Sequence, residues 1–171
     1  MSHSNRVAAR HDRVWQAVLA ADLAASPISK GLLFLRGYGR RAFRRGSATF
    51  PERLVRFGFT KIAESPGREI VFGLAGQFWR PAGGFRPLAD AAAFQTFAEE
   101  GCVKAAWNLR VEGASENAAD FETETRIQYF GAAAKTKFRV YWTLVGPFSG
   151  FLRRALLRDV ARRATRPATS R

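Results

Sequence analysis

Length, composition and charge restrict the class of protein that this chain can form. Its 171 residues, of which 47% are hydrophobic, suffice for one domain with a sizeable core, and the formal net charge is +14. The single cysteine, Cys102, excludes an internal disulfide, and the longest uncharged run, 140–152, is shorter than the roughly 18 residues that span a bilayer. We expect a cytoplasmic protein without a signal peptide, because the apolar segment at 14–21 is short and contains Gln16.

The N-terminal part is predicted to contain one strand and two short helices. Residues 4–9 form the strand, and a helix opens at His11. Its apolar residues recur at helical spacing, namely Val14, Trp15, Val18, Leu19 and Leu23. Pro27 ends this pattern, a second helix follows at 28–35, and the glycine- and arginine-rich segment 37–46 is predicted to be a loop.

A first hairpin is predicted over residues 53–79. Val55, Phe57 and Phe59 alternate with polar or small residues, which is the period-two pattern of a half-buried strand. Ser65-Pro66-Gly67 supplies turn residues, and the same period then continues through Ile70, Phe72, Leu74 and Phe78. The segment 81–87 contains two prolines and two glycines, and it is predicted to be a loop.

A second hairpin shows the clearest alternation in the chain. Apolar residues occupy the odd positions of 103–112 and polar residues most of the even ones, and the segment 121–129 repeats this pattern with threonines at two of its odd positions. Two such strands, joined through 113–118, form an antiparallel hairpin with one dry face. Placing Arg110 opposite Glu122 sets opposite charges together on the polar face and leaves the apolar set on the other, so we expect a firmly specified register.

The C-terminal part is predicted to be helical, with an interruption. Helical spacing begins at 132–145, and an apolar stripe continues over 148–160. Gly146 and Pro147 stand between the two segments, and a proline inside a helix costs about 3 kcal/mol or more. We therefore predict helix on both sides with a bend or a gap between, and a bend at this place would leave room for a cavity.

Positive charge gathers at both ends of the chain. Five arginines fall within 36–45 without a carboxylate, and Arg154, Arg158 and Arg162 recur every four residues along one helix face. Such charge attracts an anionic membrane or nucleic acid, and a solvated basic surface without a partner is the simplest alternative. Because the aromatic residues are predicted to be buried, and so are not available for stacking on bases, membrane contact ranks above nucleic acid.

The order of the predicted elements favours an α+β fold, because the strands are grouped and do not alternate with helices. Four segments set this order: NRVAARHDRVWQAVLAAD, LVRFGFTKIAESPGREIVFGLAGQFWRP, KAAWNLRVEG and FETETRIQYFG. With the basic terminal helix, they resemble the START-like or SRPBCC superfamily, which includes polyketide cyclases or dehydrases and lipid-transfer proteins. The resemblance covers residues 4–164.

The resemblance implies a helix-grip fold, in which a curved antiparallel sheet wraps around a long C-terminal helix and two short helices follow the first strand. We expect one domain over 1–171, with 165–171 as a frayed tail. In that family an apolar cavity between sheet and helix holds a hydrophobic ligand. The loop at 37–46 departs from the family pattern.

The leading hypothesis is therefore the binding of a hydrophobic small molecule or lipid between the sheet and the C-terminal helix. The predicted ligand-binding residues are Trp107, Phe121, Thr123, Thr125, Phe138, Tyr141, Trp142 and Phe148. In the alternative reading, the aromatic residues interlock as an ordinary core and the threonines are present for strand propensity. A cyclase- or dehydrase-type enzyme using the same cavity and a basic membrane or nucleic-acid adaptor stay open as rival functions. The sequence implies no particular oligomeric state.

Catalytic patterns are scarce, and we expect neither a catalytic residue, nor a metal site, nor a cofactor. The two histidines, His3 and His11, both lie near the N-terminus, so no metal cluster or histidine-based triad can be assembled. Glu122 and Glu124 share the polar face of a strand, where we expect them to pair with the cross-strand cations Arg110 and Lys104. Cys102 has no activating neighbour in sequence, which predicts an inert thiol.

Overall fold

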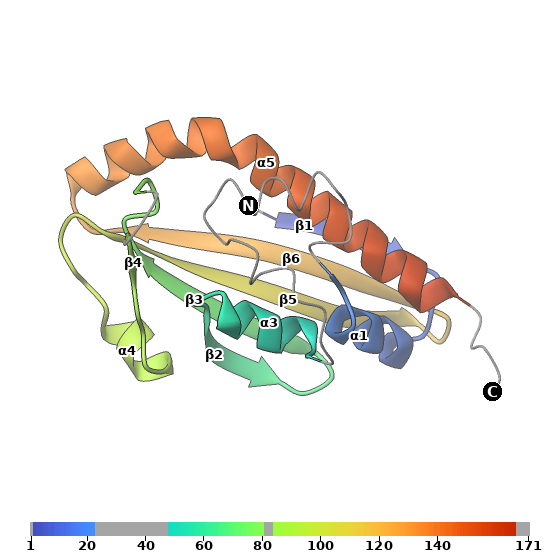
Figure 1. Cartoon of the computed structure of the whole chain (residues 1–171). Helices are drawn as coiled ribbons and strands as arrows, with labels where there is room; N and C mark the ends of the chain where they lie inside the picture. Colours follow the sequence, from blue (N-terminus) through green and yellow to red (C-terminus); the bar gives the residue numbers. More distant parts are fainter. Residues whose placement is uncertain (1, 23–47, 81–83, 167–171) are drawn as a thin grey trace.

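The chain folds into a curved antiparallel sheet with one long helix laid along it (Figure 1). The computed structural model describes residues 2–22, 48–80 and 84–166. The elements in chain order are β1 (Ser2–Val7), α1 (His11–Leu19), α3 (Phe50–Arg56), β2 (Thr60–Ser65), β3 (Glu69–Gly76), β4 (Phe85–Arg86), α4 (Ala91–Thr96), β5 (Val103–Ser115), β6 (Ala118–Tyr129) and α5 (Ala132–Thr165). The predicted α+β class is confirmed, in the helix-grip arrangement.

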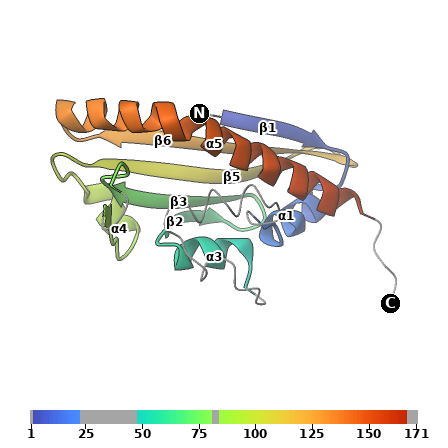
Figure 2. The same ribbon diagram turned by 45° about the horizontal axis from the view of Figure 1, so that its top comes forward.

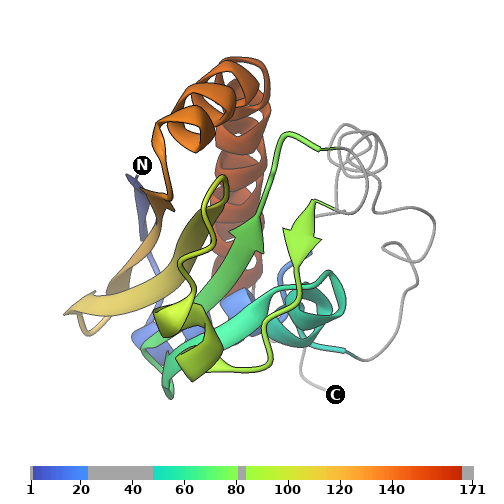
Figure 3. The ribbon, with the colours of Figure 1, turned by 90° about the vertical axis from the view of Figure 1, so that its left-hand side faces the viewer.

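The sheet places β1, from the N-terminus, beside the last strand. The order is β1-β6-β5-β3-β2, and the short β4 pairs with the end of β3. Figure 2 shows β1 and β6 running near α5, and Figure 3 shows the other strands stepping away toward α3. The antiparallel pairing of β1 with β6 therefore places the first strand of the chain beside the last one.

The β5–β6 hairpin has the predicted register. Arg110 lies opposite Glu122, and Trp107 lies opposite Thr125. Trp107 packs against the cluster of buried residues that contains Phe121, so both lie on the face toward the core. The strands run further than predicted and leave only residues 116 and 117 as the turn.

The carboxylates on the polar face of β6 have partners other than the predicted cross-strand cations. Glu122 accepts a hydrogen bond of 2.7 Å from the Ser2 hydroxyl, and Glu124 pairs with Arg126 at 2.9 Å. β1 places Ser2 beside Glu124 in register and so near this face, whereas Arg126 lies two residues after Glu124 on the same face of β6. The carboxylates of Glu122 and Glu124 are thus used in surface contacts at the β1 edge.

The predicted strand at 53–59 is wrong in its first half, because residues 50–56 form the helix α3. Thr49 and Glu52 form a capping box, in which each side chain accepts from the other's backbone N–H, and Pro51 stands in the first turn. These helix-start signals outweigh the period-two alternation that follows them. The hairpin itself is confirmed over β2 and β3, with the turn at Ser65-Pro66-Gly67 closed by a bond from Arg68 N–H to the Ser65 carbonyl.

The helix α1 is confirmed from His11 to Leu19. The predicted strand at 4–9 is observed as β1, shifted toward the N-terminus to Ser2–Val7. The second helix at 28–35 and the loop at 37–46 lie outside the described residues, as do 167–171 of the expected tail.

The helix α5 is continuous through Gly146 and Pro147, so the predicted gap is wrong, whereas the predicted bend is present. Figure 1 shows the two halves of α5 running in different directions over the sheet. A proline has no N–H to give to the carbonyl four residues earlier, which is enough to bend a helix. Buried residues such as Phe138 and Leu156 hold the halves on either side against the sheet.

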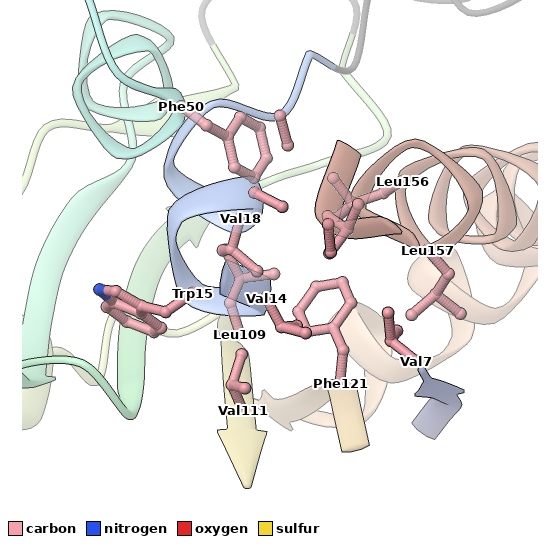
Figure 4. Packing of buried hydrophobic residues seen from close by; sticks show 14 of the residues in the cluster. Val7, Val14, Trp15, Val18, Phe50, Leu109, Val111, Phe121, Leu156 and Leu157 are labelled. Atoms are coloured by element: carbon pink, nitrogen blue, oxygen red, sulfur yellow. The ribbon is translucent and has the colours of Figure 1, made fainter. Parts of the chain in front are cut away.

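The apolar interior consists of two clusters. The larger one joins α1, α3, the C-terminal half of α5 and the middle of the sheet, and Figure 4 shows Phe121 within it among Val14, Val7 and Leu156. The smaller one lies under the N-terminal half of α5 and comprises Leu74, Phe78, Val103, Ala134 and Phe138. The candidate site lies beside the smaller cluster, against which Ile127 and Trp142 pack. No helix among the described residues carries an apolar stretch long enough to cross a bilayer.

Candidate ligand-binding site

The side of α5 that faces the sheet has small residues where the two halves of the helix meet. Trp142, Gly146, Gly150 and Arg153 follow one another on this side of the helix, and both glycines are buried. A Cβ at Gly146 would come within 3.0 Å of the Trp142 indole nitrogen. At Gly150, the only described side-chain atom within 4 Å of such a Cβ would be Arg154 Nη1, at 3.9 Å. The two glycines therefore let the indole lie across the helix and leave space beside it.

A pocket of about 410 Å³ opens where β1 stops covering β6. The pairing of β1 with β6 ends at Glu124, so the rest of β6 has no β1 neighbour in the described part of the chain. The residues that line the pocket are Glu124, Thr125, Arg126, Ile127, Tyr129 and Trp142. Its volume is in the range of small-molecule sites, and half of its lining residues are apolar or aromatic while the other half are polar or charged.

Aromatic contacts fix the orientation of the apolar walls. Phe138 is 2% exposed and stacks on Trp142 with ring centroids 5.4 Å apart. The Tyr129 ring meets the same Phe138 ring edge-on at 5.6 Å. Offset and edge-on pairs of this kind contribute about 0.5–1.5 kcal/mol each beyond their buried area. Both walls are consequently anchored on one buried ring.

Two side-chain hydrogen bonds end on the inner-face threonines of β6. Trp107 Nε1 donates to the Thr123 hydroxyl at 2.5 Å, and Thr123 is fully buried. Arg153 Nη2 donates to the Thr125 hydroxyl at 2.6 Å, and Arg153 is only 6% exposed. The two threonines that the sequence placed on the dry face thus act as acceptors for an indole and a guanidinium.

The electrostatics near Thr125 are positive. Burial lowers the pKa of the Arg153 guanidinium, and this side chain is part of no ion pair among the described residues. Burial, and next the charge of Arg153, lower the pKa of His3 on β1. The Nδ1 atom of His3 is buried without a hydrogen-bond partner in the described structure. The lowered pKa favours the neutral imidazole, first because burial disfavours the charged form and next because a second charge beside Arg153 is unfavourable.

The predicted ligand-binding residues fall into three groups. Thr125 and Trp142 line the pocket, whereas Trp107 and Thr123 are hydrogen-bonded to each other and are not lining residues. Phe138 and Tyr141 belong to the smaller cluster, from which Phe138 supports the walls. The other two lie apart from the pocket: Phe121 is fully buried in the larger cluster, and Phe148 is 50% exposed on the outer side of α5.

Sequence reasoning did not select Arg153, Ile127 or His3. Arg153 follows Trp142 by 11 residues, close to three helical turns, so a projection of α5 would have placed it on the inner side. Ile127 continues the odd-position series of β6, which is a signal for the inner face. For His3 no local pattern exists, because its position depends on the pairing of β1 with β6.

The described residues offer little for metal or thiol chemistry. None of their His, Cys, Asp and Glu side chains form a group of three that could hold a metal ion. Cys102 is buried, and burial raises the pKa of its thiol, which keeps the unreactive protonated form. At the pocket, the hydrogen bond from Arg126 lowers the pKa of Glu124, so this carboxylate is a poor general base.

Comparisons with known proteins give only weak likeness, and it is to solved structures. No protein-family model matches the chain, and no curated protein matches it. Among solved structures, the chain is similar to the crystal structure of Zhui aromatase/cyclase from Streptomyces sp. R1128, at 15% identity and a TM-score of 0.34, over 100% of this chain and 98% of that one. A likeness at this level carries no argument about function.

Proposed function

We propose that the protein binds a hydrophobic small molecule in the pocket between β6 and the N-terminal half of α5. The observation that carries the proposal is the pocket at the uncovered end of β6, with Ile127, Tyr129 and Trp142 among its walls. Apolar walls held by a buried ring are preorganised, which reduces the entropy that binding costs. This is also the function that the resemblance to START-like proteins implies.

Binding of Nile red, a neutral apolar dye, tests this proposal by fluorescence titration. We expect binding to the purified chain, weakened about tenfold in Trp142→Ala, the factor that corresponds to about 1.4 kcal/mol of lost apolar contact. The control is Phe148→Ala, which removes an exposed ring from the outer side of the same helix. Equal losses in the two variants, or no binding to the unaltered chain, would refute the pocket.

A second function, contact with an anionic membrane surface, is favoured by the outer side of α5. Val140, Leu144 and Phe148 are 64%, 69% and 50% exposed and recur every four residues. The same side continues into the exposed arginines Arg154, Arg158 and Arg162. An apolar row followed by a basic row suits the boundary between acyl chains and anionic headgroups.

Vesicle flotation measures this contact. We expect binding to vesicles that contain phosphatidylglycerol and little binding to phosphatidylcholine alone, with a decrease at high salt because the charges are screened. Leu144→Gln should weaken flotation, whereas the matched control Val55→Gln, at a 50% exposed residue of α3, should not. Equal flotation of both variants would count against the outer side of α5.

A further inference from the structure

Arg153 is a buried cation that forms no ion pair with a carboxylate of the described residues. All fourteen Asp and Glu residues lie within the described residues, since 1, 23–47, 81–83 and 167–171 contain none. None of the ion pairs of the described residues includes Arg153, although Asp159, on the next turns of α5, pairs with both Arg162 and Arg163. A buried charge without a counter-ion is costly, so it needs an explanation.

One half of the guanidinium has a partner and the other half does not. Nη2 donates to Thr125, whereas Nη1 is buried and has no hydrogen-bond partner among the described residues. Thr125 is also a wall of the pocket at the β6 edge. The guanidinium is therefore bonded to a threonine that lines the pocket, although Arg153 is not itself one of the lining residues.

We propose that Arg153 binds the carboxylate of an amphipathic ligand whose apolar part occupies the pocket between Ile127, Tyr129 and Trp142. The proposal rests on the proposed function and adds the chemical class of the ligand. A carboxylate accepts from a guanidinium in plane and supplies the negative charge that the site lacks. The bonded group leaves the positive charge of the guanidinium in place, because the Thr125 hydroxyl is neutral and no carboxylate of the described residues pairs with Arg153.

The test compares two ligands with the same tail. Dodecanoate and dodecanol, each below its aggregation concentration, displace Nile red from the full chain at neutral pH. We expect dodecanoate to bind about tenfold more tightly or better, because hydrogen bonds to charged partners are the stronger kind. Dodecanol should still bind, since its tail meets the same walls.

Variants of two arginines show whether Arg153 causes the tighter binding of dodecanoate. Arg153→Met should abolish the preference for dodecanoate and leave dodecanol binding in place, and Arg153→Lys should restore part of it. Replacing a buried charge by an apolar side chain of similar volume is usually tolerated by a fold. Arg139→Met is the matched control on the same helix, because it removes the same charge at an exposed residue and should leave the preference unchanged.

The outcomes separate this inference from the proposed function. If both ligands bind equally to the unaltered chain, the carboxylate site is wrong and the apolar pocket stands. If the preference survives Arg153→Met, or is lost equally in Arg139→Met, the net charge of the protein explains it and Arg153 does not. If neither ligand binds, the proposed function fails and the inference fails with it.

Discussion

Among single residues, His3 has a pKa that depends on the charge of Arg153. Burial and then that charge lower the pKa of His3, so the fold favours its neutral form. The stability that His3 contributes is therefore present above the ordinary histidine pKa of about 6.5 and is lost as the pH falls through its lowered value. Only two histidines occur in the chain, which makes each resonance easy to follow.

We predict that an NMR titration gives His3 a pKa below the ordinary value, and that Arg153→Met raises it by removing the charge. The control is Arg139→Met, at an exposed residue elsewhere on α5, which should leave the titration of His3 unchanged. A His3 pKa that stays the same in Arg153→Met would show that the two side chains do not interact.

Part of the candidate site could be predicted from single residues. The alternation of the second hairpin correctly placed Trp107, Thr123 and Thr125 on the face toward the core, because strand periodicity fixes the face of each side chain. The same rule could not distinguish Phe121, which is buried in the larger cluster, from a wall of the pocket. That difference depends on which part of α5 lies above each strand residue, and no local pattern encodes it.

Among the elements, α5 contains the proline whose effect on the pocket can be tested by substitution. Pro147 lies inside a continuous helix whose halves pack on separate clusters. We predict that Pro147→Ala keeps the fold, raises the free energy of unfolding by about 1 kcal/mol or more, and weakens the binding of Nile red as the helix straightens. Urea unfolding and dye titration measure the two effects.

A second proline serves as the control for this prediction. Pro66 stands in the β2–β3 turn, followed by Gly67 with a φ of 77°. Pro66→Ala should lower the free energy of unfolding by about 0.4–1 kcal/mol, through the entropy of the unfolded chain, and should leave dye binding unchanged. Unaltered dye affinity in Pro147→Ala would mean that the bend has no part in forming the pocket.

The elements themselves differ in how well sequence predicts them. The β5–β6 register was predictable because one dry face and an opposed charge pair exclude a one-residue slip. At 53–59, three alternating apolar residues were a weaker signal than Thr49, Pro51 and Glu52, which start a helix. In α5 the predicted bend at Pro147 is present but the predicted gap is not, because packing on both sides keeps the helix continuous.

In the whole molecule, the two sides of α5 carry the residues of the two proposed functions. The inner side covers the pocket and carries Arg153, and the outer side presents the apolar and basic rows. A carrier of a membrane-derived ligand benefits from both, because the pocket opens at the edge of β6 next to the same helix. The expected single domain over 1–171 stays a prediction.

The most direct test of the account is to map where an apolar ligand lies by two-dimensional ¹H–¹⁵N NMR, with dodecanol added to the full chain. We predict the largest shifts at Thr125, Ile127, Tyr129 and the Trp142 indole N–H, with little change at Leu144 on the outer side of α5. Largest shifts on that outer side, or among the α1 residues of the larger cluster, would contradict a pocket between β6 and α5.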